Sequence, residues 1–563
     1  MTRVRISHPY LALLLVLLLV GWFGSLEHRG LFNPDEGRYA EIPREMLATG
    51  DWTTPRLNDL KYFEKPPLQY WLTALSFAAF GEDEWTARLP TALLGFAALW
   101  FVAWTARRLW GPRAALLASA FLGSCWGFYI CGQYLTLDMT LSAFLTFALC
   151  AFILAQRAAT DALQRNWMLV AWIGAALAML AKGLIALVLP GLSLLVYSLV
   201  TRDWRVWRRL HLSSGLPLFA LLALPWFVMV QARNPEFFEF FVLREHFQRF
   251  LETNHARLGP WWYYVPIALV GTMPWTPLVV ARMFAPASST PAAHREFDVD
   301  RFCLSWALVI LAFFSVSKSK LPAYVVPMLP ALALWTCHLA NHARLAALRH
   351  CGALLVAVGL AGGGMAALWL PAWPRFGALG QAAHDALPIV VASMLALAAA
   401  GGVALFAARR GRAQAAILSL VAGSLLFWAG LFGFLHQTDA SFSSERIIED
   451  LSNDTKPFEP GVPFYSVGMF DPSLPFYLGR PVTLVKTRGE LGPGIDLEPL
   501  KQVATMGEFR RLWTDASEQA YAAMTLAQFA ELKERDVPMT QVIADQRLIV
   551  VKRFGTGAPQ PAR

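Results

Sequence analysis

Residues 9–26 read PYLALLLVLLLVGWFGSL, an apolar run long enough to enter the ~30 Å hydrocarbon layer of a bilayer as a helix. Similar apolar runs recur along the first 435 of the 563 residues. Hydrophobic residue types make up 56% of the chain and charged types only 15%, whereas soluble proteins carry about 25% charged residues. The composition excludes a cytosolic enzyme and predicts a polytopic α-helical membrane protein.

The apolar runs predict thirteen membrane spans. They lie near residues 10–26, 89–106, 114–130, 138–155, 167–181, 184–200, 214–231, 263–281, 302–316, 321–340, 352–370, 388–408 and 414–435. No A-x-A cleavage site follows the first run, so we expect it to stay as a helix instead of being removed as a signal peptide.

Basic residues alternate between loops in a way that predicts the orientation. With a cytoplasmic N-terminus, the inner loops hold nineteen arginines, and the short outer connections hold only Lys182, Lys318, Lys320 and Arg375. The loops 27–88 and 232–262 and the tail from 436 then lie on the non-cytoplasmic face. The net charge of +9 is dispersed between apolar runs, so we attribute it to topology and expect no nucleic-acid binding.

The tail from residue 436 has a different pattern. Long apolar runs stop, and short β-rich stretches appear at 464–467, 482–485 and 548–551. Thr525 followed by Gln528 is typical of a capped helix start, which predicts a helix over 526–535. We therefore expect two domains, a transmembrane domain over 1–435 and a small α/β domain over 436–563.

The first outer loop contains NPDEGRYAEIPREMLATGDW at residues 33–52. Apolar side chains recur there at helical spacing opposite charged ones, which predicts an interfacial helix lying along the membrane surface. Pro43 is expected to kink or interrupt it, and Gly50 to end it. Asp35 suits the N-cap of this helix as well as it suits a catalytic carboxylate, and the two roles are compatible because a helix N-terminus keeps a carboxylate ionised.

Four stretches together carry a family resemblance. They are the loop just quoted, YFEKPPLQYW at 62–71, YLTLDMTLSAF at 134–144 and SKSKLPAYVVPMLPALAL at 317–334. In this order they resemble the GT-C glycosyltransferases of the protein-mannosyltransferase superfamily, and within it the lipid A aminoarabinose transferases. The resemblance implies a GT-C fold in a bacterial inner membrane, with the C-terminal domain in the periplasm.

The resemblance also implies an activity and a site. A 4-amino-4-deoxy-L-arabinose group would move from undecaprenyl phosphate to lipid A phosphate groups at the periplasmic face, a lipopolysaccharide modification tied to polymyxin resistance. Asp35 and Asp138 match the two family acids, and Glu36 adjoins the first. The residues expected to hold the lipid phosphate are Lys65, Arg249 and Tyr324. Inversion at the anomeric carbon by a single displacement is implied too.

A metal or other cofactor is not required by this chemistry. Glu64, His246 and His255 lie in outer loops, but no H-x-x-x-H or acid-x-acid pair accompanies them, so a structural or adventitious zinc at Glu64 and His246 is the metal site left open. The expected partners are the lipid-linked donor, lipid A and membrane lipids, and we expect a monomer.

Two other functions remain open from the sequence. A polyprenyl-phosphate-dependent transferase with a protein or other glycan acceptor would share the same loop acids. A lipid transporter or flippase would need charges at mid-span, whereas the charges here gather in loops and at span ends.

Overall fold

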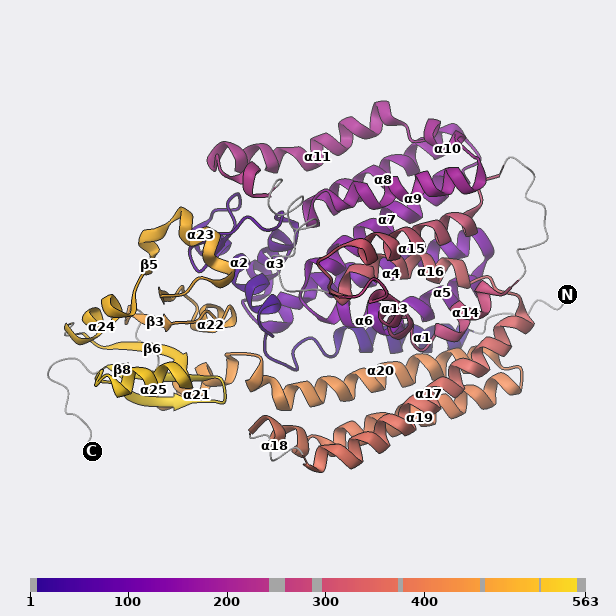
Figure 1. The fold of residues 1–563 in the computed structure, drawn as a ribbon. Coiled ribbons are helices and arrows are strands. Elements are labelled where there is room, and N and C mark those ends of the chain that lie inside the picture. Colours follow the sequence, from indigo (N-terminus) through magenta and orange to yellow (C-terminus); the bar gives the residue numbers. More distant parts are fainter. Residues whose placement is uncertain are drawn as a thin grey trace.

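The computed structural model describes residues 8–241, 259–285, 296–372, 378–455, 461–515 and 518–553. Within these ranges, helices lie side by side in a bundle, and a small sheet domain formed by the C-terminal residues sits beyond one end of it (Figure 1). This arrangement agrees with the predicted fold class.

Every predicted span overlaps a helix or a pair of helices. The elements of the bundle are α1 (His8–Phe23), α4 (Glu84–Trp110), α5 (Pro112–Ser124), α6 (Trp126–Gln133), α7 (Leu137–Gln156), α8 (Asp161–Lys182), α9 (Ile185–Thr201), α11 (Leu212–Arg233), α13 (Tyr264–Gly271), α14 (Thr276–Met283), α15 (Val299–Val316), η2 (Pro322–Met328), α16 (Leu329–Thr336), α17 (Asn341–Trp369), α19 (Leu387–Arg409) and α20 (Ala413–Thr438). In the described part of the chain, seven helices are long and apolar enough to cross a membrane, or nine if each bent pair counts as one span.

Three predicted spans are not straight α-helices. The run at 114–130 bends by 58° between α5 and α6, and the run at 263–281 bends by 111° between α13 and α14. The run at 321–340 begins as the 3-10 helix η2. Proline explains the last two, because Pro274 lies in the α13–α14 break and Pro322 and Pro327 lie in η2, where the ring removes an N–H donor.

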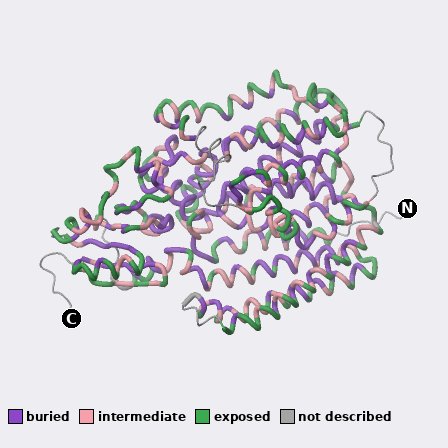
Figure 2. The backbone as a smooth tube through the Cα atoms, in the orientation of Figure 1, coloured by how far each residue is buried: buried purple, intermediate pink, exposed green. Residues whose placement is uncertain are grey.

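Helix α7 runs through the centre of the bundle. In an apolar 18-residue stretch of α7, 94% of the residues are buried. Within the bundle, Figure 2 shows exposed residues mainly on outer helices such as α11, α17 and α19. Small residues allow neighbours to approach α7 closely: a Cβ on Gly174 of α8 would lie 2.9 Å from the carbonyl oxygen of Phe144. The backbone at the start of α7, which carries Asp138, is therefore held firmly.

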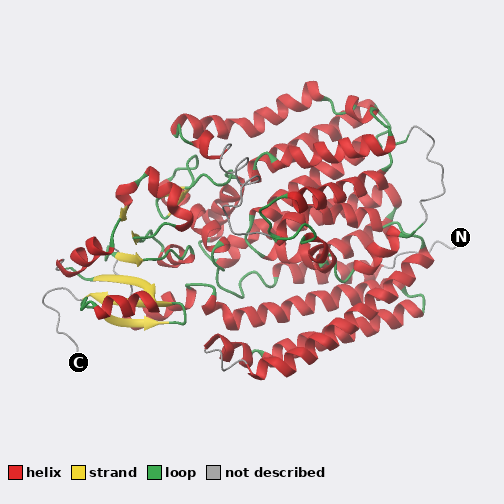
Figure 3. Ribbon diagram, in the orientation of Figure 1, coloured by secondary structure: helices red, strands yellow, loops and turns green. Residues whose placement is uncertain are grey.

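The C-terminal domain is a mixed sheet with helices. Its strand order is β5-β4-β3-β6-β8-β7, with parallel pairing from β5 to β6 and antiparallel pairing from β6 to β7 (Figure 3). The strands are β3 (Phe464–Val467), β4 (Thr483–Val485), β5 (Gln502–Val503), β6 (Ala520–Thr525), β7 (Thr540–Ala544) and β8 (Leu548–Arg553), and the helices α21 (Glu445–Thr455), α22 (Ser473–Leu478), α23 (Gly492–Leu497), α24 (Met506–Asp515) and α25 (Leu526–Glu534). Thr525 caps α25 by accepting the N–H of Gln528, as predicted.

The first loop folds against this sheet. Between α1 and α4 it forms α2 (Asp35–Thr49), β1 (Arg56–Leu57), β2 (Leu60–Lys61) and α3 (Leu68–Phe80). Alternate residues of β6 belong to different hydrophobic clusters. Tyr521 and Ala523 belong to the cluster that also holds Ile42 and Met46 of α2, whereas Ala522 belongs to the cluster that holds residues of α24 and α25.

The polar face of α2 is buried, and the position of this helix relative to the membrane surface stays a prediction. Glu41, Arg44 and Glu45 are buried, and Arg44 donates to the carbonyl oxygen of Gly479 at 2.8 Å. The C-terminal domain supplies partners for two arginines of α2, Arg38 and Arg44. Pro43 does not interrupt the helix, which continues to Thr49 before the left-handed Gly50.

Candidate functional site

Asp35 opens α2 with a partly accessible carboxylate. Its side chain is 34% exposed and pairs with Arg38 one turn later. The N-cap interpretation is wrong, because Pro34 occupies the N-cap position and no side chain caps the helix. The carboxylate of Asp35 thus contacts one guanidinium and remains accessible from outside the helix.

Arg38 links Asp35 to the C-terminal domain and to the second half of the loop. It donates to Glu490 at 2.6 Å and to the hydroxyl of Tyr62 at 2.8 Å. Burial raises the pKa of Tyr62 well above 10, so its phenol stays neutral. Three residues farther on, Lys65 Nζ donates to the carbonyl oxygen of Glu64 at 2.7 Å.

Glu36 is placed unlike its neighbour. Its side chain is 0% exposed and lies between Arg29 and Arg88, with Arg88 donating at 2.8 and 3.0 Å. The backbone N–H groups of Phe32 and Leu135 donate to it at 3.1 and 3.0 Å. Burial alone would raise the pKa of Glu36, but the two arginines outweigh it and lower the pKa to about 2.

These contacts do not support the predicted catalytic role of Glu36. Both of its oxygens are engaged by donors of the protein, and no part of the side chain faces solvent. Its contact with Leu135 joins the first turn of α2 to the segment just before α7. Glu36 therefore anchors the two helix starts that carry Asp35 and Asp138 at the same end of the bundle.

Asp138 forms a second group with two residues from distant segments. It pairs with Lys182 at the end of α8, and Lys182 Nζ lies 4.6 Å from the ring centroid of Tyr324 in η2. The structure thus brings Asp138 and Tyr324 to one cation. Thr136 is the N-cap residue of α7, and Asp138 lies in the first turn of the helix.

Lys182 was not predicted as a site residue. The available signal was its isolation, because it is the single basic residue in the short outer connection between two apolar runs. By contrast, Lys320 in the turn before Tyr324 is buried and donates to the carbonyl oxygens of Ser315 and Ser317 at 2.7 and 2.6 Å. Lys320 closes the end of α15, and Lys318 beside it is exposed.

Three predicted residues lie outside the described ranges: Arg249, His246 and His255. The phosphate-binding prediction for Arg249 and the zinc prediction for Glu64 with His246 both stay predictions. Among the residues that the structure describes, no group of three or more His, Cys, Asp or Glu side chains is arranged to hold a metal ion. All six cysteines are unpaired, and five of them are buried, as expected of small core residues.

An apolar cavity of about 370 Å³ opens beside Tyr324. Pro322, Ala323 and Val326 of η2 form one wall. The other walls come from α6, α13 and α20, and their lining residues are Trp126, Gly127, Ile130, Cys131, Pro266, Ile267, Val270, Gly271 and Trp428. A hydrocarbon chain fits the chemistry of this cavity, and the cation and hydroxyl near Asp138 suit a phosphate.

Two family models match the chain. A model described as dolichyl-phosphate-mannose-protein mannosyltransferase matches residues 9–241, and one described as aminoarabinose transferase C-terminal domain matches residues 453–553. The first match covers the bundle from α1 to α11, and the second covers the sheet domain from the end of α21 to β8.

Curated relatives and solved structures agree with the models. Undecaprenyl phosphate-alpha-4-amino-4-deoxy-L-arabinose arabinosyl transferases of Enterobacter sp. and Pseudomonas paraeruginosa are 33% and 36% identical over 340 and 370 residues. These alignments span 60% and 64% of this chain and the same shares of the relatives. The crystal structure of ArnT from Cupriavidus metallidurans bound to undecaprenyl phosphate is 33% identical, with a TM-score of 0.88, and the match covers 99% of this chain and 100% of that one. The fold class with its small C-terminal domain is thereby confirmed.

Proposed function

This chain belongs to the ArnT family of GT-C glycosyltransferases, and from that membership we propose that it transfers 4-amino-4-deoxy-L-arabinose from undecaprenyl phosphate to a phosphate group of lipid A. The observation that carries the proposal is the site itself: an accessible acid at the start of α2, and a cation with an aromatic ring beside Asp138 of α7, lie at one end of the bundle, near an apolar cavity. The cation and the hydroxyl suit a phosphate, and the cavity suits a prenyl chain.

The donor phosphate is the leaving group in this proposal. Negative charge builds on it as the bond to the sugar breaks, and cations in a partly dry site stabilise that charge. Lys182 and Tyr324 are suited to this role by their contact, and Lys65 joins them through the family resemblance. Asp138 orients Lys182 through their ion pair.

The transfer is a single displacement at the anomeric carbon. An oxygen of the lipid A phosphate forms the new bond to C1 while the bond from C1 to the donor phosphate breaks, and undecaprenyl phosphate leaves with the electron pair. A phosphate with a second pKa of about 6 is mostly dianionic at pH 7, so the acceptor needs positioning more than deprotonation. Asp35 then stabilises the positive charge that develops on the sugar ring.

The same proposal includes a location. The distribution of arginines between loops favours a cytoplasmic N-terminus, and with that orientation the site and the C-terminal domain face the periplasm of a bacterial inner membrane. Both lipid substrates reach such a site from the bilayer.

The test uses the purified full chain in detergent with undecaprenyl phosphate-linked aminoarabinose and lipid A. Mass spectrometry should show a donor-dependent mass increase on a phosphate of lipid A. Modification of an added protein or glycan instead of lipid A would support the alternative acceptor class. Donor movement across vesicle membranes without any product would support the flippase function.

We expect Lys182→Met to raise the KM for the donor at least about tenfold, because a charge-assisted contact to the leaving phosphate is lost. The measurement is initial rates against donor concentration. Lys318→Met is the matched control, since this lysine is exposed in an outer turn. Equal KM values for the two variants would contradict the role of Lys182.

We expect Ala323→Trp to discriminate between donors by chain length. The indole would occupy much of the apolar cavity, so the KM for the undecaprenyl donor should rise about tenfold, while a donor with a short prenyl chain should be affected less. Ala361→Trp on an exposed position of α17 is the control. An equal effect on both donors would show that the prenyl chain lies elsewhere.

A further inference from the structure

The sheet domain holds Asn33, two residues before Asp35, through its side chain and its backbone. Asn33 Nδ2 donates to Asp471 Oδ1 at 2.5 Å and to Ser473 Oγ at 2.9 Å, and Asn33 Oδ1 accepts the backbone N–H of Ser473 at 2.9 Å. The backbone N–H of Asn33 donates to the carbonyl oxygen of Phe442 at 2.9 Å. Both ends of the Asn33 amide are therefore fixed by residues more than 400 positions later in the chain.

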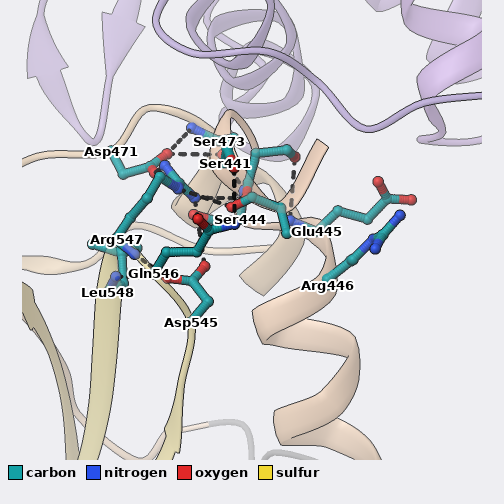
Figure 4. Close-up of polar contacts among 12 residues, drawn as sticks. Ser441, Ser444, Glu445, Arg446, Asp471, Ser473, Asp545, Gln546, Arg547 and Leu548 are labelled. Atoms are coloured by element: carbon teal, nitrogen blue, oxygen red, sulfur yellow. Dashed lines mark hydrogen bonds and ion pairs between the residues drawn. The ribbon is translucent and has the colours of Figure 1, made fainter. Parts of the chain in front are cut away.

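Asp471 is in turn fixed by Arg547 (Figure 4). Asp471 is buried, and its second oxygen accepts from Arg547 Nη1 at 2.8 Å. Arg547 also donates to the carbonyl oxygens of Ser443 at 2.6 Å and Ala440 at 3.1 Å. It stands in the turn between β7 and β8, where Asp545 accepts its backbone N–H at 2.7 Å. The turn between β7 and β8 thus fixes Asp471, which in turn contacts Asn33.

The start of α2 depends on these contacts because it has no cap of its own. Asparagine suits a helix N-cap, yet the amide of Asn33 is engaged by the sheet domain, and Pro34 makes no side-chain cap hydrogen bond. The two segments also approach closely: a Cβ on Gly37 would lie 2.6 Å from the backbone nitrogen of Ser473. Tertiary contacts therefore set where the first turn of α2 lies.

We propose that Asp471 and Arg547 are positioning residues for the transfer reaction, which hold Asn33 and through it the turn that carries Asp35. This inference rests on the proposed function and assigns a role to the C-terminal domain. Misplacement of a reacting group by about 1 Å costs up to about 10²-fold in rate, so loss of the Asn33 contact should act mainly on kcat.

A double-mutant cycle tests the proposal in the full chain. Asn33→Ala and Asp471→Ala should each lower kcat at least about tenfold, and the double variant should be no slower than the slower single variant, because both changes break one connection. The Kd for undecaprenyl phosphate should change less than about twofold, since its phosphate contacts lie near α7. Asp496→Ala removes an exposed ion pair with Arg488 in the same domain and is the matched control. Unchanged kcat in the single variants, or multiplicative losses in the double variant, would overturn the proposal.

Two further readouts separate positioning from mere stability. Hydrogen exchange of the amides at residues 35–38 should speed up in both single variants while the amides of β3 keep their protection, whereas a purely structural role would expose both. Arg547→Lys should retain more kcat than Arg547→Met, because it keeps a charged donor for Asp471. If the wild type transfers no sugar, the proposed function fails. If hydrogen exchange of the amides at 35–38 is unchanged in the single variants, the proposal that Asp471 and Arg547 position α2 is overturned, whatever reaction the protein catalyses.

Discussion

Asp35→Asn should lower kcat by about 10³-fold, because the carboxylate that stabilises charge on the sugar in the transition state is replaced by a neutral amide of the same shape. The substitution keeps a hydrogen-bond acceptor for Arg38, and the side chain is partly exposed, so the fold should survive. Single-turnover rates with the lipid-linked donor measure the chemical step directly.

A control and a binding measurement make this result specific. Asp59→Asn changes a half-exposed carboxylate in the same loop and should leave kcat unchanged within about twofold. The Kd of the Asp35 variant for undecaprenyl phosphate should also stay within about twofold, because the proposed function assigns the leaving phosphate to Lys182 and Tyr324. Wild-type turnover in Asp35→Asn would remove this residue from the mechanism.

Glu36→Gln should destabilise the protein although it lies beside Asp35. Neutralising this carboxylate leaves Arg29 and Arg88 buried without their counter-ion, and breaking a buried ion pair in this way costs about 3–5 kcal/mol. The midpoint of thermal unfolding in detergent should fall by about 5 °C or more. Protein that remains folded should retain transfer activity, which a catalytic residue would not allow.

The pH dependence of stability gives a second test of Glu36. Its pKa in the folded protein is about 2, below the ordinary value of 4.5, so the carboxylate contributes stability above pH 4.5. That contribution declines as the pH falls from 4.5 toward 2, because the unfolded state takes up the proton first. Glu36→Gln should flatten this part of the stability curve relative to wild type. Wild-type stability combined with lost activity would return Glu36 to the catalytic group.

Adjacent residues show how far the sequence could define the site. Asp35 and Glu36 share one motif and one helical turn, and both suit a catalytic carboxylate by residue type. They differ in their partners. Asp35 forms an ion pair with one arginine and is partly exposed, whereas Glu36 forms ion pairs with two arginines and accepts hydrogen bonds from two backbone N–H groups. Arg88 and Leu135 lie 52 and 99 positions away from Glu36, so no local pattern predicts these contacts.

Helix α2 shows the same limit for the fold. Its amphipathic pattern predicts a helix correctly, but a charged face has two stable environments, water or a buried set of matched partners. The pattern cannot distinguish them, because Arg38 and Arg44 also donate to residues 490 and 479 of the C-terminal domain, far along the chain. The sequence therefore predicts the helix and not its surroundings.

By itself the sequence determined that this is a polytopic helical membrane protein with a small C-terminal α/β domain, and four motifs indicated its family. Apolar runs and the alternation of apolar residues in strands are enough for these predictions. The free energy gained by removing apolar side chains from water depends on the pattern within each segment, whichever segments it later packs against. Only the tertiary structure decided which acid is an anchor, that Lys182 joins Asp138 to Tyr324, and that the sheet domain holds the start of α2. Electrostatic and hydrogen-bond contacts act over a few ångströms in space, and here their partners are separated by tens to hundreds of residues along the chain.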